Sequence, residues 1–210
     1  SMRRGQTRMI GILLCDTIEF FQYTLYQTLE AELWKLGYQC ILTTYGNLNV
    51  SDKIRTLRQR NVDGLILYYY LPDPAVHDAI TEALEDGVPV ILLDSDAPDL
   101  VTDKVLVDNL NASFRAVEIM IQKGHRDIAV VTGTEKHPVS SERLSGYLEC
   151  MKAYGLPIQE GYVLYGHFSI ADSYNAVSRL MKLPRPPTAL FTGSYHMTFG
   201  AIMAIREAGF

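Results

Sequence analysis

Cysteine is scarce in this chain. Cys15, Cys40 and Cys150 are its only three thiols among 210 residues, and no two of them form a CxxC pair. A disulfide framework or a structural zinc site normally needs paired or closely spaced cysteines. The sequence therefore argues against both, and its cysteine usage fits a reducing cytoplasm.

Long apolar runs are also missing. No stretch approaches the roughly 18 apolar residues that a membrane helix needs. A secretory signal is not apparent, because Arg3, Arg4 and Arg8 precede a short apolar strand and not a long apolar segment. We therefore expect no membrane contact and a cytoplasmic location. The apolar fraction of 48% and the charged fraction of 20% are typical of a globular chain.

Catalytic and nucleotide-binding motifs are absent as well. The chain has no GxGxxG, GxxxxGK[ST], GxSxG or HExxH, and its five histidines are scattered. No nucleophile, metal-ligand set or cofactor loop is visible. The sequence therefore predicts a protein that is not an enzyme and that carries no cofactor or metal.

Positive charge is in short supply, since the net charge is -5. Binding to nucleic acid phosphates requires clustered lysine and arginine. The only basic cluster is at the head, in "RRGQTRMIGILLCD" from position 3 to 16, behind a Ser1-Met2 pair that reads as an expression remnant. Without further information, this cluster is best interpreted as a solvated tail.

Apolar strand patterns alternate with helical periods along the whole chain. Helices are expected to begin after Ser51, at Asp73-Pro74, near Asn111 and Ser141, and from Ser169 with Asp172 in a capping box. Strands are expected at 9–15, 38–44, 62–68, 89–93, 104–108, 127–132, 162–165 and 188–192.

One break interrupts this alternation. Only the polar segment "DSDAPDLVT" separates the fourth strand from the fifth, where an eight-fold β/α barrel would need a helix. The pattern instead predicts an α/β protein with two doubly wound parallel-sheet lobes. We expect a tail over 1–8, an N-terminal lobe over 9–108 and a C-terminal lobe over 109–210.

Ligands of doubly wound sheets bind beyond the carboxyl ends of the strands. The residues that follow those ends combine aromatic rings, carboxylates and one guanidinium, which suits a small polar ligand with an apolar face, such as a sugar or a nucleobase. If two lobes face each other, these residues would line the space between them. The candidate ligand-binding residues are Asp16, Phe20, Phe21, Tyr68, Asp94, Arg143, Phe168, Ser194 and Tyr195.

Each candidate also has a purely structural interpretation. The Phe20-Phe21 pair could belong to the core at the base of the first helix. Arg143 could pair with Glu142 or Glu149 on a solvated surface, and Asp94 could cap a turn. Their shared placement at strand ends is what favours a site.

The chain resembles the effector domain of the lactose/galactose-repressor family of bacterial transcription regulators, which has the type I periplasmic-binding-protein fold. The resemblance runs from Arg3 onward. It rests on "RMIGIL", "VDGLIL", "GVPVILLD", "VLVDNLNASFRAVEIMIQKGHRDIAVVTG", "SERLSGYLECMKAYGL" and "TALFTGSYHMTFGAIMAIREAGF". The stretch from Val105 to Gly155 is the most specific part.

The resemblance gives the basic head a meaning. In this family a helix-turn-helix domain and a hinge precede the effector domain, so the arginines look like the stump of a linker to a DNA-binding head. Family members also continue beyond "AIREAGF" with strands that return to the first lobe. The N-terminal lobe of this chain, which stops at Phe210, is therefore expected to lack those closing strands.

The resemblance also assigns roles to single residues. Arg143 matches an arginine that typically binds sugar hydroxyls, and Phe168 matches an aromatic platform. Tyr68 and Asp94 match a polar and an acidic position after the third and fourth strands, and the Phe20-Phe21 pair falls where many members place aromatics. Two departures change the expected pocket: Ser194-Tyr195 replaces a common Asn-Asp or Ser-Asp, and Ser95 replaces a frequent arginine. A sugar remains the first expectation, with a bulkier or more aromatic effector as the alternative.

The implied function is ligand sensing. A small effector, expected to be a sugar, would bind between the lobes and shift the balance between their open and closed arrangements. That change would alter operator-DNA binding by the helix-turn-helix heads of a homodimer. The rival interpretation is a periplasmic or extracellular sugar-binding protein that serves a transporter.

Overall fold

Every strand pair in the described part of the chain is parallel, and helices connect nearly all successive strands there. A computed structural model describes residues 6–15, 20–46, 49–69, 73–95, 97 and 99–210. The chain divides into two units, Ser1–Val107 and Asp108–Phe210, each with its own sheet. The predicted α/β class with doubly wound parallel sheets is confirmed.

Unit 1 contains a five-stranded sheet in the order β2-β1-β3-β4-β5. Apolar β1 lies inside the sheet, where Ile10 pairs with Cys40 on one side and with Gly64 on the other. The strands are β1 (Met9–Cys15), β2 (Gln39–Tyr45), β3 (Gly64–Leu67), β4 (Val90–Leu93) and β5 (Asp103–Val105).

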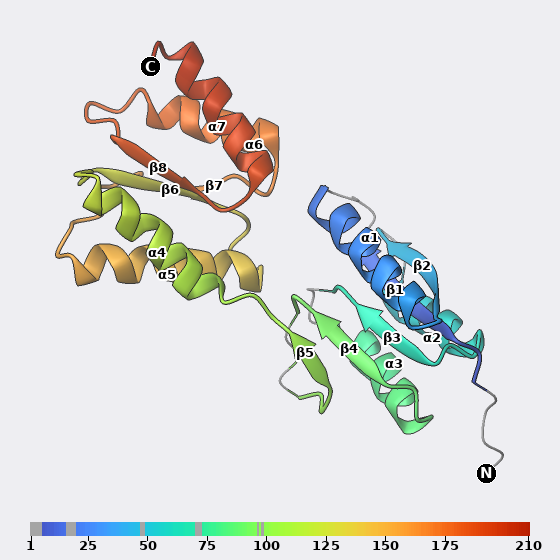
Figure 1. Cartoon of the computed structure of the whole chain (residues 1–210). Coiled ribbons are helices and arrows are strands. Elements are labelled where there is room, and N and C mark those ends of the chain that lie inside the picture. Colours follow the sequence, from blue (N-terminus) through green and yellow to red (C-terminus); the bar gives the residue numbers. More distant parts are fainter. Residues whose placement is uncertain (1–5, 16–19, 47–48, 70–72, 96, 98) are drawn as a thin grey trace. The chain divides into compact units, whose positions relative to one another are not determined.

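Helices cover both faces of this sheet (Figure 1). Helix α1 (Phe20–Lys35) packs Leu25, Leu29 and Leu33 against Ile12 and Leu14 of β1 on one face. Helices α2 (Val50–Gln59) and α3 (Pro74–Glu85) cover the other face and form the larger core with β3 and β4. The alternating side chains of the buried strands therefore serve two cores, as the doubly wound pattern requires.

Unit 2 contains a three-stranded sheet in the order β7-β6-β8. Its central strand β6 (Ile128–Thr132) is buried along its whole length, and β7 (Val163–Tyr165) and β8 (Ala189–Thr192) flank it. Helices α4 (Asn109–Gln122) and α5 (Pro138–Ala153) pack together on one face, and α6 (Ile170–Leu180) and α7 (Tyr195–Glu207) on the other (Figure 1).

Each helix pair of unit 2 meets at a glycine. A Cβ atom on Gly146 of α5 would overlap the carbonyl oxygen of Leu110 in α4. A Cβ atom on Gly200 of α7 would overlap the carbonyl oxygen of Ile170 in α6. The backbones approach so closely that no larger residue fits without a shift.

The helix starts are where the sequence prediction needs correction. Asn49, and not Ser51, caps α2, because its side chain accepts the Ser51 N–H at 3.1 Å. Helix α4 begins at Asn109 and not near Asn111, since Asp108 caps it. Helix α5 begins at Pro138, three residues before Ser141. Proline at the first helical position needs no N–H there, which explains the earlier start.

The other predicted starts are confirmed. The Asp73 carboxylate accepts the Ala75 N–H at 2.9 Å, directly before Pro74. The Ser169 hydroxyl oxygen accepts the Asp172 N–H at 3.2 Å. The described residues between β4 and β5 contain no helix, as the polar segment predicts, and β5 is only three residues long.

Candidate functional site

The three strands of unit 2 end at one edge of the sheet, and each is followed by a glycine: Gly133 after β6, Gly166 after β7 and Gly193 after β8. Gly133 is the most constrained, because a Cβ there would overlap the Phe168 ring and the Ser140 hydroxyl. The absence of a side chain at this bend therefore allows Phe168 to lie directly over the end of β6.

Phe168 is held at this edge by an unusual backbone. Both Phe168 and the preceding His167 adopt left-handed conformations, with φ of 56° and 49°. Such values are uncommon outside glycine, and they cluster at functional sites. The Phe168 ring also meets the His137 ring edge-on, with centroids 5.0 Å apart and an interplanar angle of 61°. The predicted aromatic platform therefore has a defined orientation.

Arg143 lies at the same edge. Its Nε donates to Asn109 Oδ1 at 2.9 Å, and its Nη1 donates to the carbonyl oxygen of Gly193. Asn109 is buried, and its Nδ2 donates in turn to Glu142 Oε2 at 2.9 Å. The structure therefore places the guanidinium, half-buried, against the end of β8. Asn109 thus contacts both Arg143 and Glu142.

Two polar groups beside Arg143 were not anticipated. Burial, reinforced by the positive charge of Arg143, lowers the pKa of His137 from its ordinary value of 6.5, which keeps the ring neutral at pH 7. The Ser140 hydroxyl is buried and has no hydrogen-bond partner among the described residues. Both residues belong to the start of α5, the helix that carries Arg143.

Ser194 and Tyr195 begin the helix after β8. The Ser194 hydroxyl oxygen caps α7 by accepting the Met197 N–H at 3.3 Å. The Tyr195 ring lies 4.2 Å from the His196 ring and contacts Phe199 edge-on at 6.4 Å between centroids. Ser194 thus has a structural task at this edge, while Tyr195 adds a half-buried ring to it.

In unit 1, the aromatic candidates gather on α1 and at the end of β3. Phe20 and Phe21 open α1 with exposed fractions of 74% and 47%, so they lie outside the core. The Phe21 ring is 6.5 Å from the ring of Tyr68. Tyr68 is only 7% exposed and packs with Ile12, and its N–H donates to the Leu13 carbonyl at 2.9 Å. Asp16 lies outside the described residues.

Asp94 follows β4 in a left-handed conformation with φ of 50°, and its N–H donates to the Val105 carbonyl at 2.8 Å. The neighbouring Ser95 is buried, and its hydroxyl accepts the Tyr69 N–H at 3.1 Å while donating to the Leu93 carbonyl at 3.0 Å. Ser95 therefore ties the ends of β3 and β4 together where many relatives were expected to carry an arginine.

Sequence reasoning found part of each edge. In unit 2 the structure brings Arg143 and Phe168 to one edge and adds Asn109, His137 and Ser140, which the prediction missed. Two signals pointed to them: Asn109 directly follows the predicted fifth strand, 104–108, and His137 directly precedes a proline that starts a helix. In unit 1 it brings together Phe21 and Tyr68, with Asp94 after the neighbouring strand β4.

Within the described ranges, no three His, Cys, Asp or Glu side chains are grouped so that they could hold a metal ion. None of the helices that the structure describes combines the length and apolar character needed to cross a bilayer.

Residues 7–210 match the family described as periplasmic binding proteins and the sugar-binding domain of the LacI family. The match covers more than half of the chain, so the protein belongs to this family. The resemblance identified from the sequence is confirmed, and so is the predicted fold.

Individual relatives are transcription regulators. The HTH-type transcriptional repressor CytR of Escherichia coli K12 is 28% identical over 211 residues, covering 100% of this chain and 61% of the relative. The ribose operon repressor of the same strain is 30% identical over 212 residues, covering 99% of this chain and 63% of the relative. The chain therefore spans somewhat over 60% of the length of these relatives.

Solved structures agree. A regulatory protein of the LacI family from Chloroflexus aggregans is 30% identical, with a TM-score of 0.83 over 96% of this chain and 74% of that one. A complex of the transcriptional regulator CelR with cellobiose is 25% identical, with a TM-score of 0.82 over 97% of this chain and 64% of that one.

Proposed function

We propose that this chain is the effector-sensing part of a LacI-type transcriptional regulator, and that its effector is a small polar molecule, with a sugar as the first expectation. The observation that carries the proposal is the fixed position of Arg143 at the carboxyl edge of the unit 2 sheet, between Asn109 and Gly193. The family description and the cellobiose complex of CelR support a sugar.

The chemistry of the edge fits such a ligand. A guanidinium is planar and carries five N–H donors, which suits vicinal hydroxyl oxygens better than a lysine ammonium does. The Phe168 ring offers an apolar face for a sugar ring. Tyr195 adds a second ring where relatives were expected to carry an aspartate, which favours an effector bulkier or more aromatic than a simple hexose.

The proposal assigns unit 1 a complementary role. Phe20, Phe21, Tyr68 and Asp94, with Asp16, would contact the same effector from the carboxyl edge of their own sheet. A ligand that binds one arrangement of the two units better than another shifts the balance between them by that difference in affinity. This is the proposed route from effector to DNA.

In this proposal, a helix-turn-helix segment of the whole protein binds DNA, as in the HTH-type relatives. Binding to operator DNA implies that the protein acts in the cytoplasm. Operator binding by such heads commonly uses a two-fold dimer. A homodimer through α7 is supported by its exposed apolar residues Phe199, Ile202 and Met203, which are 55%, 44% and 55% exposed. Apolar groups gathered on one exposed helix commonly mark a protein interface.

The regulator is favoured over a transporter's binding protein because the named relatives are repressors of transcription. Non-catalytic sensing is proposed too, so a ligand should bind without turnover. The genomic sequence upstream of the chain separates the two readings, since a helix-turn-helix supports regulation and a signal peptide supports transport.

The site is tested by a thermal-shift screen with sugars, sugar phosphates and nucleobases. A ligand that binds the folded state raises the melting temperature. At a ligand concentration one hundred times Kd, the folded state is stabilised by about 2.7 kcal/mol. The best ligand is then repeated on Arg143→Ala, with Arg179→Ala, an exposed arginine of α6, as the matched control. We expect the shift to vanish only in Arg143→Ala, and an unchanged shift there would count against the site.

A further inference from the structure

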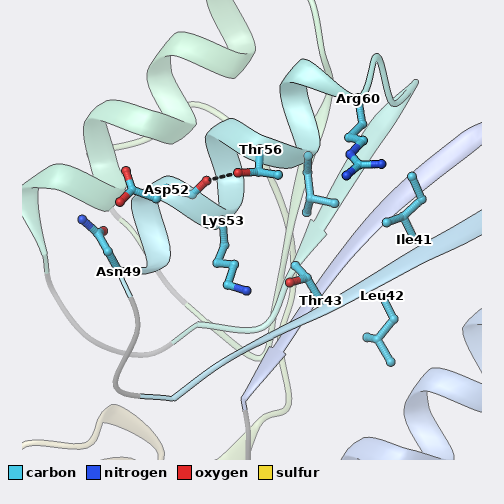
Figure 2. Close-up of a pocket in the computed structure, with 9 residues that line it drawn as sticks. Ile41, Leu42, Thr43, Asn49, Asp52, Lys53, Thr56 and Arg60 are labelled. Carbon is cyan, nitrogen blue, oxygen red and sulfur yellow. Dashed lines mark hydrogen bonds between the residues drawn. The ribbon is translucent and has the colours of Figure 1, made fainter.

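A ligand-sized hollow lies within unit 1, between helix α2 and the outer strand β2. Its volume is about 570 Å³, within the range of roughly 300–1,000 Å³ that is typical of small-molecule sites. Figure 2 shows that α2 forms one wall and β2 the other. Ile41 and Leu57 supply apolar surface, and the residues after the strand ends described above do not line this hollow. We call it the β2 groove.

Two cations line the β2 groove: Lys53 of α2, and Arg60, the C-cap residue that follows α2. Lys53 and Arg60 are seven positions apart, which places them on one face of the helix with roughly 10 Å between them along its axis. Figure 2 shows Lys53 extending from α2 toward Thr43 of β2, and Arg60 at one end near Ile41. The groove therefore has two separate positive groups, Lys53 near its middle and Arg60 at one end.

Neither cation has an anionic partner. In the part of the chain that the structure describes, Lys53 and Arg60 form no ion pair and no side-chain hydrogen bond, whereas the arginines of α2 are paired. Arg55 and Arg58 contact the carboxylate of Glu82 at 3.0 and 2.8 Å. The cations on the α3 side of α2 are thus paired with a carboxylate of α3, whereas Lys53 and Arg60 leave the groove side positive.

The strand adds hydrogen-bonding groups to the groove. The Gln39 N–H donates to the Arg8 carbonyl on the inner side of β2, so the backbone groups of alternate residues, including Leu42, point to the outer edge. The Leu42 side chain points away from α2 in Figure 2, which leaves its backbone to line the groove. The Thr43 hydroxyl also lines it.

One carboxylate lines the same groove and has to be weighed. Asp52 Oδ1 lies 3.8 Å from Arg55 Nη1, on the helix side already neutralised, and its carboxylate points away from Lys53 in Figure 2. The field that a bound molecule meets near Lys53 and Arg60 is therefore positive.

We propose that the β2 groove binds a small organic polyanion, with phosphoryl or carboxylate groups near Lys53 and Arg60 and a short carbon skeleton over Ile41 and Leu57. Ammonium and guanidinium groups form charge-assisted hydrogen bonds with such anions, and the Leu42 N–H and Thr43 hydroxyl are further donors. This site is separate from the proposed effector site and does not depend on it.

The test uses the full chain, isothermal titration calorimetry and two probes, fructose 1,6-bisphosphate and citrate, with fructose as the uncharged comparison. We expect saturable binding of at least one of the two polyanions in wild type and in Arg143→Ala. Each of Lys53→Gln and Arg60→Gln should weaken binding about tenfold, because one charge-assisted hydrogen bond contributes on that order. Lys123→Gln, an exposed lysine of unit 2, is the matched control and should change nothing.

Three outcomes would overturn the proposal. Binding that survives the Lys53→Gln/Arg60→Gln double variant places the anion elsewhere, and an equal loss in Lys123→Gln means unspecific charge attraction. If neither polyanion binds, the small-molecule site is rejected, and this includes the case in which only an extended acidic peptide pairs with the edge of β2. Amide chemical-shift changes at Leu42 and Thr43 on titration would support it.

Discussion

Arg143 Nε donates a hydrogen bond to Asn109 Oδ1 at 2.9 Å, and this contact joins α5 to the first residue of α4. Asn109 is 4% exposed and also donates to Glu142, so its amide connects a cation and a carboxylate from the same helix. A buried neutral amide therefore helps to fix the position of the guanidinium.

Replacing that amide should affect both stability and binding. Asn109→Ala leaves Arg143 and Glu142 without their shared partner, and we expect a loss of about 1–3 kcal/mol in the free energy of unfolding. Urea unfolding measures it. Asn111→Ala is the comparison, because Asn111 is exposed and its side chain bonds only locally to Asp108. Equal losses in the two variants would contradict the bridging role of Asn109.

The bend at Gly133 should tolerate no side chain. In Gly133→Ala the new methyl group would overlap the Phe168 ring and the Ser140 hydroxyl, and such overpacking typically costs about 1–3 kcal/mol. Gly193→Ala is the matched control at the next strand end, since its Cβ would meet Met197 Cε at 3.3 Å, a flexible methyl group that can move. Melting temperatures of the two variants decide the point, and a larger drop for Gly193→Ala would refute it.

Acid should destabilise the chain through His137. Its pKa is lowered in the folded state, chiefly by burial and then by Arg143, so the unfolded state binds the proton more readily. The His137 contribution is complete above the ordinary pKa of 6.5 and is lost progressively as the pH falls below it. We expect His137→Gln to flatten the decline of the unfolding free energy below pH 6.5, measured by chemical denaturation at several pH values. An unchanged pH profile would exclude His137 as the cause.

Self-association should depend on α7. Met203→Glu places a charge among the exposed apolar residues Phe199 and Ile202, and burying an unpaired charge in an interface is costly. Light scattering should show a dimer for the wild-type chain and a monomer for this variant. Ile119→Glu, a change at a 53% exposed apolar residue of α4, should leave the dimer intact. A dimer that persists in Met203→Glu would remove α7 from the proposed interface.

The sequence predicted the order of strands and helices well because the cores impose regular periods. Leu25, Leu29 and Leu33 recur with the helical period of α1 and face the sheet, as a buried face demands. Boundaries were less predictable where local chemistry offers two choices. Ser51 and Asn49 are both good caps, and only the three-dimensional backbone shows that Asn49 takes the position.

The candidate site was predictable to a similar degree. Strand ends can be located from a sequence, so Arg143 and Phe168 could be assigned to one edge. The partners of Arg143 could not, because Asn109 lies 34 positions away and its approach depends on how α4 packs on α5. Likewise, no local pattern signals that Ser95 would use its hydroxyl to join two strand ends.

The glycine contacts of unit 2 have a mechanical consequence. Because Gly146 and Gly200 let the paired helices touch backbone to backbone, neither pair can slide without steric collision. A displacement at Tyr195, where α7 begins, would then move that helix as a rigid body. Any conformational change caused by a bound ligand would have to take place in the segments that connect helices and strands, such as the chain around Asp108.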